Sequence, residues 1–499
     1  MDFLLAIFYI LAFSLVLWFY KPLKFNLLPN WIPIIGFVFK ILIGFIFLQV
    51  YVYNYPKNII PSDSIRFFHD AKVLNGVFFT SEKEYFKLLF SIGNEKEQIR
   101  QYLSETHLWD SGRLSILNDF RNVIRLNSLI YFISNGSAFI HVIFMSFLSF
   151  IGIQQIFKAI SPISKVKPLV VFILLLFIPS MLFWTSGILK EPIVLLGIGL
   201  LLRVIFYKEP IKSKILPFLI SFIILIGFKP YLLLCLIPAL IFSLLNKYIF
   251  NYKYYKSIIS IILTTSVIIL LIPKTVNQIV HYAYKRQTNF ALSGKGGLII
   301  EGNSCFYQIE KNSEKNIAID KLNHTAKILK STQAICYSND YIKLPFRVTL
   351  KPNVHYYKIK SNEPPANSYF EYSSINNSTT QLIKNIPEAF INALFRPFIT
   401  DSNSKLKYPA IIEILIVFTF FLIAFYYRRT LSKEMLNTIL SIILFAIILL
   451  LLIGWITPIS GAIFRYRFPV QLALVIIGIL LIDPAKIKQF SFNKKPENV

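Results

Sequence analysis

The chain has 499 residues, of which 55% are hydrophobic and only 15% are charged, and its mean hydropathy is +0.59. A soluble protein of this length needs more charge to cover its surface, so the composition predicts an integral membrane protein. The formal net charge of +27 does not indicate a nucleic-acid partner, because no folded basic domain is apparent. The basic residues flank apolar stretches, where we expect them to meet anionic membrane lipids.

About eleven apolar stretches are expected to cross the bilayer. They lie at residues 3–20, 31–53, 129–153, 168–188, 193–207, 215–228, 231–246, 257–273, 409–427, 436–456 and 469–483. Lys and Arg are concentrated in alternate connections, which predicts that these short loops are cytoplasmic: 21–30, 155–167, 208–214, 247–256 and 428–434. The first stretch has no basic residue before it and lysines after it, so we expect an uncleaved helix with its N-terminus outside.

The predicted fold class is therefore an all-α polytopic membrane protein with amphipathic interfacial helices and one large mixed outer loop. The chain divides into membrane helices 1–2 (1–53), an outer loop with amphipathic helices (54–128), membrane helices 3–8 (129–273), a large outer, periplasmic loop (274–407), membrane helices 9–11 (408–483) and a cytoplasmic tail (484–499). In the first outer loop, apolar residues recur among charges at near-helical spacing.

The large outer loop carries signs of strands and of a disulfide. Alternating side chains at 346–350 and 354–359 indicate short strands. Cys305 and Cys336 both lie in this loop and can form a disulfide if the compartment is oxidising, although the sequence does not fix their geometry. Cys235 lies inside an apolar stretch, where packing is the expected role.

A polar segment follows the second apolar stretch, on the expected outer side. Its carboxylate at Asp63 is placed to deprotonate an acceptor hydroxyl during sugar transfer, and His69 or Asp70 could assist or help to bind a divalent cation. The alternative is structural. Ser62 or Asp63 would then cap a short helix, and Arg66 would pair with an acid at helical spacing.

A second polar group lies at the outer end of the fourth apolar stretch, between Pro179 and Glu191. Pro179 interrupts the backbone hydrogen bonds of a helix and loosens that turn. Lys190 would then grip a phosphate as a compact charge, with Trp184 as a further substrate contact and Glu191 as another candidate catalytic acid. The alternative is an interfacial Trp anchor with a cation at a helix C-terminus.

Arginines form a third candidate group on the outer side, at Arg396, Arg465 and Arg467. The guanidinium fork matches two phosphate oxygens, and neighbouring aromatic residues suit a sugar face or a lipid interface. The alternative is that these side chains extend to lipid headgroups.

The sequence has no phosphate-binding glycine loop, no zinc-type ligand spacing and no nucleotide-binding fingerprint. Energy input from cytoplasmic ATP is therefore not expected, which favours a lipid-linked, already activated donor or passive transport. No cofactor is expected beyond a divalent cation.

Three stretches together resemble the multi-spanning proteins of bacterial surface-polysaccharide clusters, which are similar to GT-C glycosyltransferases. They are Asp63-Ser64-x-x-Phe67-x-His69, Pro179-Ser180-x-x-Phe183-Trp184-x-Ser186-Gly187-x-x-Lys190-Glu191, and Arg465-x-Arg467-x-Pro469. The resemblance implies polyprenyl-phosphate sugars as substrates, Asp63 as the base that activates the acceptor, and Arg465 and Arg467 near the donor phosphate. The chain departs from the GT-C pattern because its early acid follows the second expected helix, not the first. The long late loop also resembles O-antigen polymerases of the Wzy type.

These features predict a membrane-embedded glycosyltransferase at the outer face of the cytoplasmic membrane, acting on polyprenyl-linked sugars in surface-polysaccharide biosynthesis. Its partners would be a lipid-linked sugar donor, a glycan acceptor and membrane lipids, with no nucleic acid. The alternatives are a Wzy-type polymerase, a flippase or exporter of lipid-linked glycans, and a non-catalytic assembly partner. A transporter would carry charges deep in the bilayer and an internal repeat. Here Lys40 and Arg203 are the exceptions within the apolar stretches, and both are expected near helix ends.

Overall fold

The computed structural model describes residues 2–53, 62–93, 95–109, 116–271, 273–320, 325–338, 343–401 and 407–487. Parts of the predicted outer loop (54–61 and 110–115) and most of the predicted cytoplasmic tail (488–499) lie outside the described residues. The chain forms two compact units. Unit 1 comprises Met1–Ile241, Ile416–Ile443 and Gln471–Val499, and unit 2 comprises Phe242–Leu415 and Leu444–Val470.

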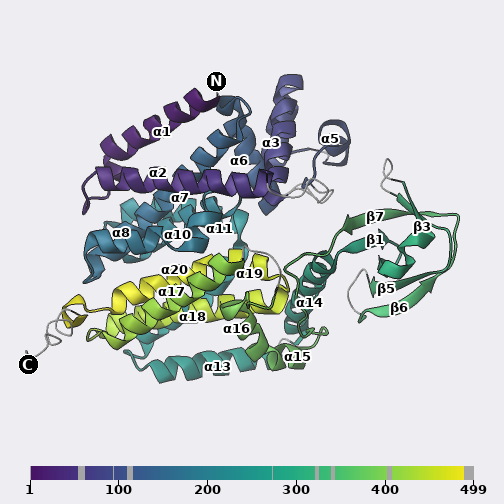
Figure 1. Ribbon diagram of the computed structural model, residues 1–499. Helices are drawn as coiled ribbons and strands as arrows, with labels where there is room; N and C mark the ends of the chain where they lie inside the picture. Colours follow the sequence, from purple (N-terminus) through teal and green to yellow (C-terminus); the bar gives the residue numbers. More distant parts are fainter. Residues whose placement is uncertain are drawn as a thin grey trace, which may run out of the picture. The chain divides into compact units, whose positions relative to one another are not determined.

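Unit 1 is built from helices (Figure 1, purple to teal for its N-terminal part). They are α1 (Asp2–Phe19), α2 (Trp31–Leu48), α3 (Asp63–Thr80), α4 (Glu82–Phe90), α5 (Glu95–Tyr102), α6 (Asp119–Ser134), α7 (Ala138–Ile160), α8 (Pro168–Leu176), α9 (Pro179–Trp184), α10 (Glu191–Phe206) and α11 (Ile211–Phe228). Four longer helices contribute residues to both units, namely α12 (Pro230–Leu244), α17 (Lys407–Tyr426), α18 (Lys433–Ile456) and α20 (Phe468–Leu481). Helices that belong to unit 2 are α13 (Tyr254–Leu271), α14 (Pro273–Lys295), α15 (Thr379–Lys384), α16 (Ile386–Phe395) and α19 (Ser460–Tyr466).

Among the described residues, seven helices are long and apolar enough to cross a membrane. These spans are Asp2–Phe19, Trp31–Tyr51, Ala138–Ile163, Ile211–Phe228, Pro230–Ile249, Lys407–Tyr426 and Lys433–Ile456. An eighth arises if α19 and α20, which meet at 48°, are one bent span. The prediction of a helical membrane protein is thus confirmed. Other expected spans are shorter or broken, because 168–188 is divided into α8 and α9, and α10 has only 16 residues.

The expected single helix at 129–153 is in fact two helices, α6 and α7. Asn135 and Gly136 have φ values of 50° and 74°, a left-handed conformation that ends α6, and Ser137 then precedes α7. Because α6 begins at Asp119, it also includes residues that the sequence placed in the outer loop, so the expected boundary at 128 falls inside this helix.

Helices α7 and α10 pack at backbone distance. A Cβ added to Gly199 would lie 2.3 Å from the carbonyl oxygen of Gly152, and one added to Gly152 would lie 2.6 Å from that of Leu195. Small residues allow such close approach between membrane helices. These two helices therefore hold each other without intervening side chains at this crossing.

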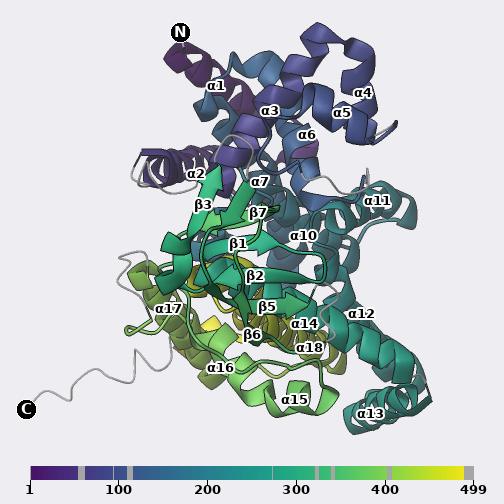
Figure 2. The same cartoon turned by 90° about the vertical axis from the view of Figure 1, so that its right-hand side faces the viewer.

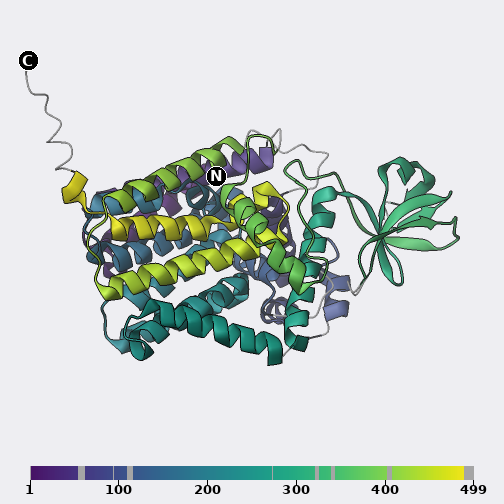
Figure 3. The same ribbon diagram turned by 90° about the horizontal axis from the view of Figure 1, so that it is seen from below.

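Unit 2 contains an antiparallel sheet of seven strands in the order β3-β4-β7-β1-β2-β5-β6 (Figure 2). The strands are β1 (Gly297–Glu301), β2 (Cys305–Ile309), β3 (Ile317–Asp320), β4 (Thr325–Ile328), β5 (Thr332–Ser338), β6 (Phe346–Leu350) and β7 (Tyr356–Glu363). The expected strand at 346–350 is confirmed, and the one expected at 354–359 begins at Tyr356 and continues to Glu363. Seen from below, the strands fan out from one another (Figure 3).

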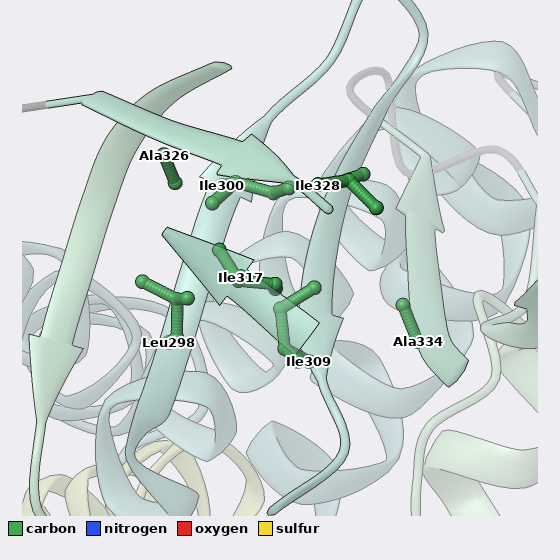
Figure 4. Packing of buried hydrophobic residues seen from close by; sticks show 7 residues of the cluster. All are labelled: Leu298, Ile300, Ile309, Ile317, Ala326, Ile328 and Ala334. Atoms are coloured by element: carbon green, nitrogen blue, oxygen red, sulfur yellow. The ribbon is translucent and has the colours of Figure 1, made fainter. Parts of the chain in front are cut away.

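The sheet has its own apolar core. Seven buried side chains contact one another across its strands, as Figure 4 shows: Leu298, Ile300, Ile309, Ile317, Ala326, Ile328 and Ala334. Cys305 and Cys336 form a disulfide between the paired strands β2 and β5, with their Cα atoms 5.5 Å apart. The pairing that the sequence left open is therefore present. This part of the loop is a folded β-structure, which the sequence indicated only at two of its strands.

Candidate functional site

The predicted site residues fall into both units, and each group is described by itself. Unit 1 holds Asp63, His69, Asp70, Trp184, Lys190 and Glu191, and unit 2 holds Arg396, Arg465 and Arg467. The richest group of buried polar side chains in unit 1 surrounds a break between α9 and α10. We call residues 185–190 the helix break.

The helix break is a buried, non-helical segment between two short helices. α9 ends at Trp184, α10 begins at Glu191, and residues 185–190 are all buried. Irregular backbone at membrane depth is stable only when protein partners or water satisfy its polar groups. The hydroxyls of Thr185 and Ser186 donate to the carbonyls of Met181 and Leu182, both at 2.6 Å, and so satisfy the end of α9.

Lys40 of α2 holds the helix break from the other side. Its Nζ donates to Thr185 Oγ1 at 2.7 Å and to Ser186 Oγ at 3.1 Å, and the side chain is fully buried. The expectation that Lys40 lies near a helix end is wrong, because it lies midway along α2. The sequence feature that could have identified Lys40 as a site residue is a lone charge within an apolar stretch, because charges inside a membrane are functional candidates by default.

Two further residues of α2, Gly44 and Phe47, contact the helix break. A Cβ on Gly44 would lie 2.8 Å from the carbonyl oxygen of Ser186, and the ring of Phe47 lies against Gly187. Trp184 is buried in an aromatic cluster, with ring centroids 6.1 Å from Phe47 and 5.8 Å from Tyr51. Trp184 is thus packed inside unit 1, and α2 fixes the position of the helix break.

Lys190, the last residue of the helix break, pairs with an acid on α6. Its Nζ lies 2.5 Å from Asp119 Oδ2 and 3.3 Å from the ring centroid of Phe120. A cation above an aromatic face is attracted by the ring electrons, most strongly when water is excluded. Lys190 is nearly buried, whereas the Asp119 side chain is 38% exposed.

Glu191, at the start of α10, pairs with Lys229 at the junction of α11 and α12. Its Oε1 lies 2.9 Å from Lys229 Nζ, and both side chains are buried. The partners Asp119 and Lys229 were both missed as site residues. In the sequence, both charged residues fall in expected loops between apolar stretches. Their contacts at the helix break are apparent only in the three-dimensional structure.

Two arginines of α6 enlarge this polar region. Arg121 and Arg125 are both buried, and both guanidinium groups lie over Trp109, at 5.2 and 5.3 Å from its ring. Arg125 also donates to Leu88 O, at 3.2 Å, and to Ser91 Oγ, at 2.5 Å. The sequence missed these arginines because it placed 119–128 in a loop.

Asp63 is the first residue of α3 and is partly buried. The helix begins after Ser62, whose side chain makes no capping hydrogen bond. Phe67, one turn after Asp63 on the same helix face, lies 5.8 Å from the Phe120 ring and 6.0 Å from Lys190 Nζ. Asp63 is therefore on the face of α3 that is directed to Lys190.

Asp70 holds the loop that follows α5. Its buried carboxylate accepts hydrogen bonds from the backbone N–H groups of His107, at 2.8 Å, and Leu108, at 2.7 Å. His69 Nδ1 lies 3.4 Å from Asp70 Oδ1, and the ring centroids of His69 and His107 are 4.8 Å apart. Burial lowers the pKa of His107, an effect that the Asp70 carboxylate opposes.

In unit 2, Arg467 directly follows α19, and its fully buried side chain lies at the C-terminal end of α16. Its Nη1 donates to the carbonyls of Ala393, Leu394 and Arg396 at 2.8–2.9 Å. Unpaired carbonyls at a helix C-terminus are stabilised by such a cation. Its Nε and Nη2 have no hydrogen-bond partner among the described residues. Burial argues against contact with lipid headgroups for this arginine.

The other two arginines are less enclosed. Arg396 pairs with Asp401, donates from Nε to Asn392 Oδ1 at 2.8 Å, and lies 3.8 Å from the Phe370 ring centroid. Arg465 is partly buried in α19. Arg396 and Arg467 are brought together by the hydrogen bond of Arg467 to the Arg396 carbonyl.

The geometry of unit 1 thus brings two ion pairs, Lys190 with Asp119 and Glu191 with Lys229, to the helix break. Comparisons with protein-family models, with curated proteins and with solved structures find no match for this chain.

Proposed function

We propose that this chain is a membrane-embedded glycosyltransferase that uses polyprenyl-linked sugars at the outer face of the cytoplasmic membrane, in surface-polysaccharide biosynthesis. The observation that carries the proposal is the group around the helix break, where Lys190 and Glu191 each make a short ion pair with another helix. Burying such groups is costly, and they are concentrated where chemistry or ligand binding requires them.

The ion pairs also support a common side for segments that the charge pattern places outside. Asp119, Lys190, Glu191 and Lys229 all belong to such segments, and within unit 1 Lys190 pairs with Asp119 and Lys229 pairs with Glu191. The disulfide between Cys305 and Cys336 supports an outer location for the sheet, because disulfides persist in oxidising compartments.

In the proposed reaction, the Asp63 carboxylate takes the proton of the acceptor hydroxyl. The acceptor oxygen then forms a bond to the anomeric carbon of the sugar. The bond from that carbon to the phosphate oxygen breaks, and polyprenyl phosphate leaves with the electron pair. Lys190 lies 6.0 Å from the ring of Phe67, which is one turn from Asp63, and in this proposal it would stabilise the departing phosphate as a point charge. Within unit 2, Arg467 holds the backbone beside Arg396, and these arginines are proposed as a separate contact for an anionic group.

The test replaces Asp63 by Asn, which removes the base and keeps the shape of the side chain. Transfer from a polyprenyl-phosphate sugar by the purified variant should fall by about 10²–10⁴-fold, with normal membrane abundance. The matched control is Glu82→Gln, because Glu82 is also an acid in the first turn of a helix but is exposed. Normal transfer by Asp63→Asn would refute the assignment. Loss with Glu191→Gln alone would move the base to the start of α10 only if that variant keeps normal membrane abundance and shows the same loss of specific activity after purification as a folded protein.

Lipids of a deletion strain separate the proposed transferase from its rivals. A transferase predicts accumulation of carriers that bear single sugars. Accumulation of complete repeat units on diphosphate carriers would instead indicate a polymerase if those carriers face outward, and a flippase if they face the cytoplasm. Accessibility to an added glycosidase distinguishes these last two outcomes.

A further inference from the structure

A cluster of two histidines and one aspartate lies beside the proposed site and has no role in the proposed transfer. His69, Asp70 and His107 each offer one ligand atom, and these atoms all lie within 4.8 Å of one another. His69 and Asp70 are adjacent on α3, whereas His107 comes from the loop after α5. We propose that these three residues bind a transition-metal cation of the Zn²⁺ type.

The first argument is the way in which Asp70 builds the cluster. Its two oxygens accept the backbone N–H groups of His107 and Leu108, which brings the His107 ring beside His69. An ionised carboxylate has about four lone-pair positions, so both oxygens can still bind a cation. Backbone donors that orient a ligating carboxylate are the usual outer support of a metal site.

The second argument is the spacing of the donors. Tetrahedral bonds of about 2.0–2.1 Å place two ligand atoms roughly 3.3 Å apart. His69 Nδ1 and Asp70 Oδ1 are 3.4 Å apart, which already fits one edge of such a site. The His69 side chain is 41% exposed and His107 is also exposed, so both rings can rotate to close the wider distances.

The third argument is donor chemistry. Two imidazoles and one carboxylate favour zinc and its neighbours over Mg²⁺ or Ca²⁺, which prefer oxygen ligands throughout. Three protein ligands also leave a fourth position for water, as in open zinc sites.

The experiment measures metal binding by the full chain in detergent micelles, purified without a histidine tag and stripped with a chelator. Co²⁺ is titrated while its visible absorption is followed, and Zn²⁺ content is measured by mass spectrometry. We expect one ion per chain, with affinity weakened about tenfold or more in His69→Gln and in His107→Gln. The control is His355→Gln, because His355 is exposed in the connection from β6 to β7 and should not alter binding.

Binding no tighter than millimolar in the unaltered chain would overturn the proposal, as would an affinity in both histidine variants that is unchanged from that of the unaltered chain. His107 is exposed, so its replacement is not expected to unfold the chain. The measurement needs no transfer assay, and its failure would therefore leave the proposed transferase untouched.

Discussion

The buried ion pair of Glu191 and Lys229 should show strong energetic coupling. The two charged atoms lie 2.9 Å apart, and the side chains are 0% and 4% exposed. Replacing Glu191 by Gln leaves a buried ammonium without this carboxylate, and we expect a loss of about 3–5 kcal/mol in the free energy of unfolding. Lys229→Met should cost a similar amount for the same reason.

The double variant, Glu191→Gln with Lys229→Met, should lose less than the sum of the two single losses because neither buried charge remains. A coupling energy of about 2–3 kcal/mol is expected, the upper end for residues in contact. The measurement is unfolding in mixed micelles with increasing denaturing detergent, followed by circular dichroism.

The chain offers a matched control in the ion pair of Lys165 and Asp483. Its nitrogen and oxygen atoms are also 2.9 Å apart, but the Lys165 side chain is 52% exposed. Water screens such a pair, so Lys165→Met should cost only about 0–1 kcal/mol. If Glu191→Gln were no more destabilising than this control, or if the double variant lost the sum of both single effects, the reasoning from burial would be refuted.

Three other predictions concern packing, capping and the disulfide. Gly199→Ala should destabilise unit 1 by about 1–3 kcal/mol, because the new Cβ meets the Gly152 backbone. In the control, Gly76→Ala, the new Cβ has no atom within 4 Å, so this change should be neutral or stabilising. Equal shifts in melting temperature for the two variants would contradict the prediction. Arg467→Met should lower the free energy of unfolding by about 1.5–3 kcal/mol, since the carbonyls of Ala393, Leu394 and Arg396 would lose their charged donor, Nη1. Unchanged thermal stability would count against this prediction. Cys305→Ser should destabilise the sheet by about 2–4 kcal/mol and speed its cleavage by protease, while Cys235→Ser, outside any disulfide, should leave that cleavage rate unchanged.

Apolar runs made the long membrane helices predictable, and alternation at 346–350 predicted β6. Both signals are local, because each depends on neighbours in the sequence. A loosened turn at Pro179 was also expected, and α8 ends at Leu176 just before it, but the non-helical segment from Thr185 to Lys190 was not expected.

The partners within the site were not predictable in this way. Lys190 meets Asp119 across 71 residues, and Lys40 meets Thr185 across 145. No periodicity connects positions so far apart. The left-handed backbone of Asn135 ends α6, and the apolar pattern of the sequence did not reveal this interruption.

The position of Lys40 has a consequence for biogenesis. Among the described residues its hydrogen bonds go only to Thr185 and Ser186, the first of which follows it by 145 residues. At about 5–20 residues per second, synthesis of that interval takes roughly 7–30 s. During this time α2 carries a lysine at its centre, which costs about 2.5–3.5 kcal/mol on translocon scales. The otherwise strongly apolar α2, with a mean hydropathy of 2.4, offsets this cost. The helix α2 is therefore expected to enter the membrane first, and its lysine finds its hydroxyl partners only after residues 185–186 have left the ribosome.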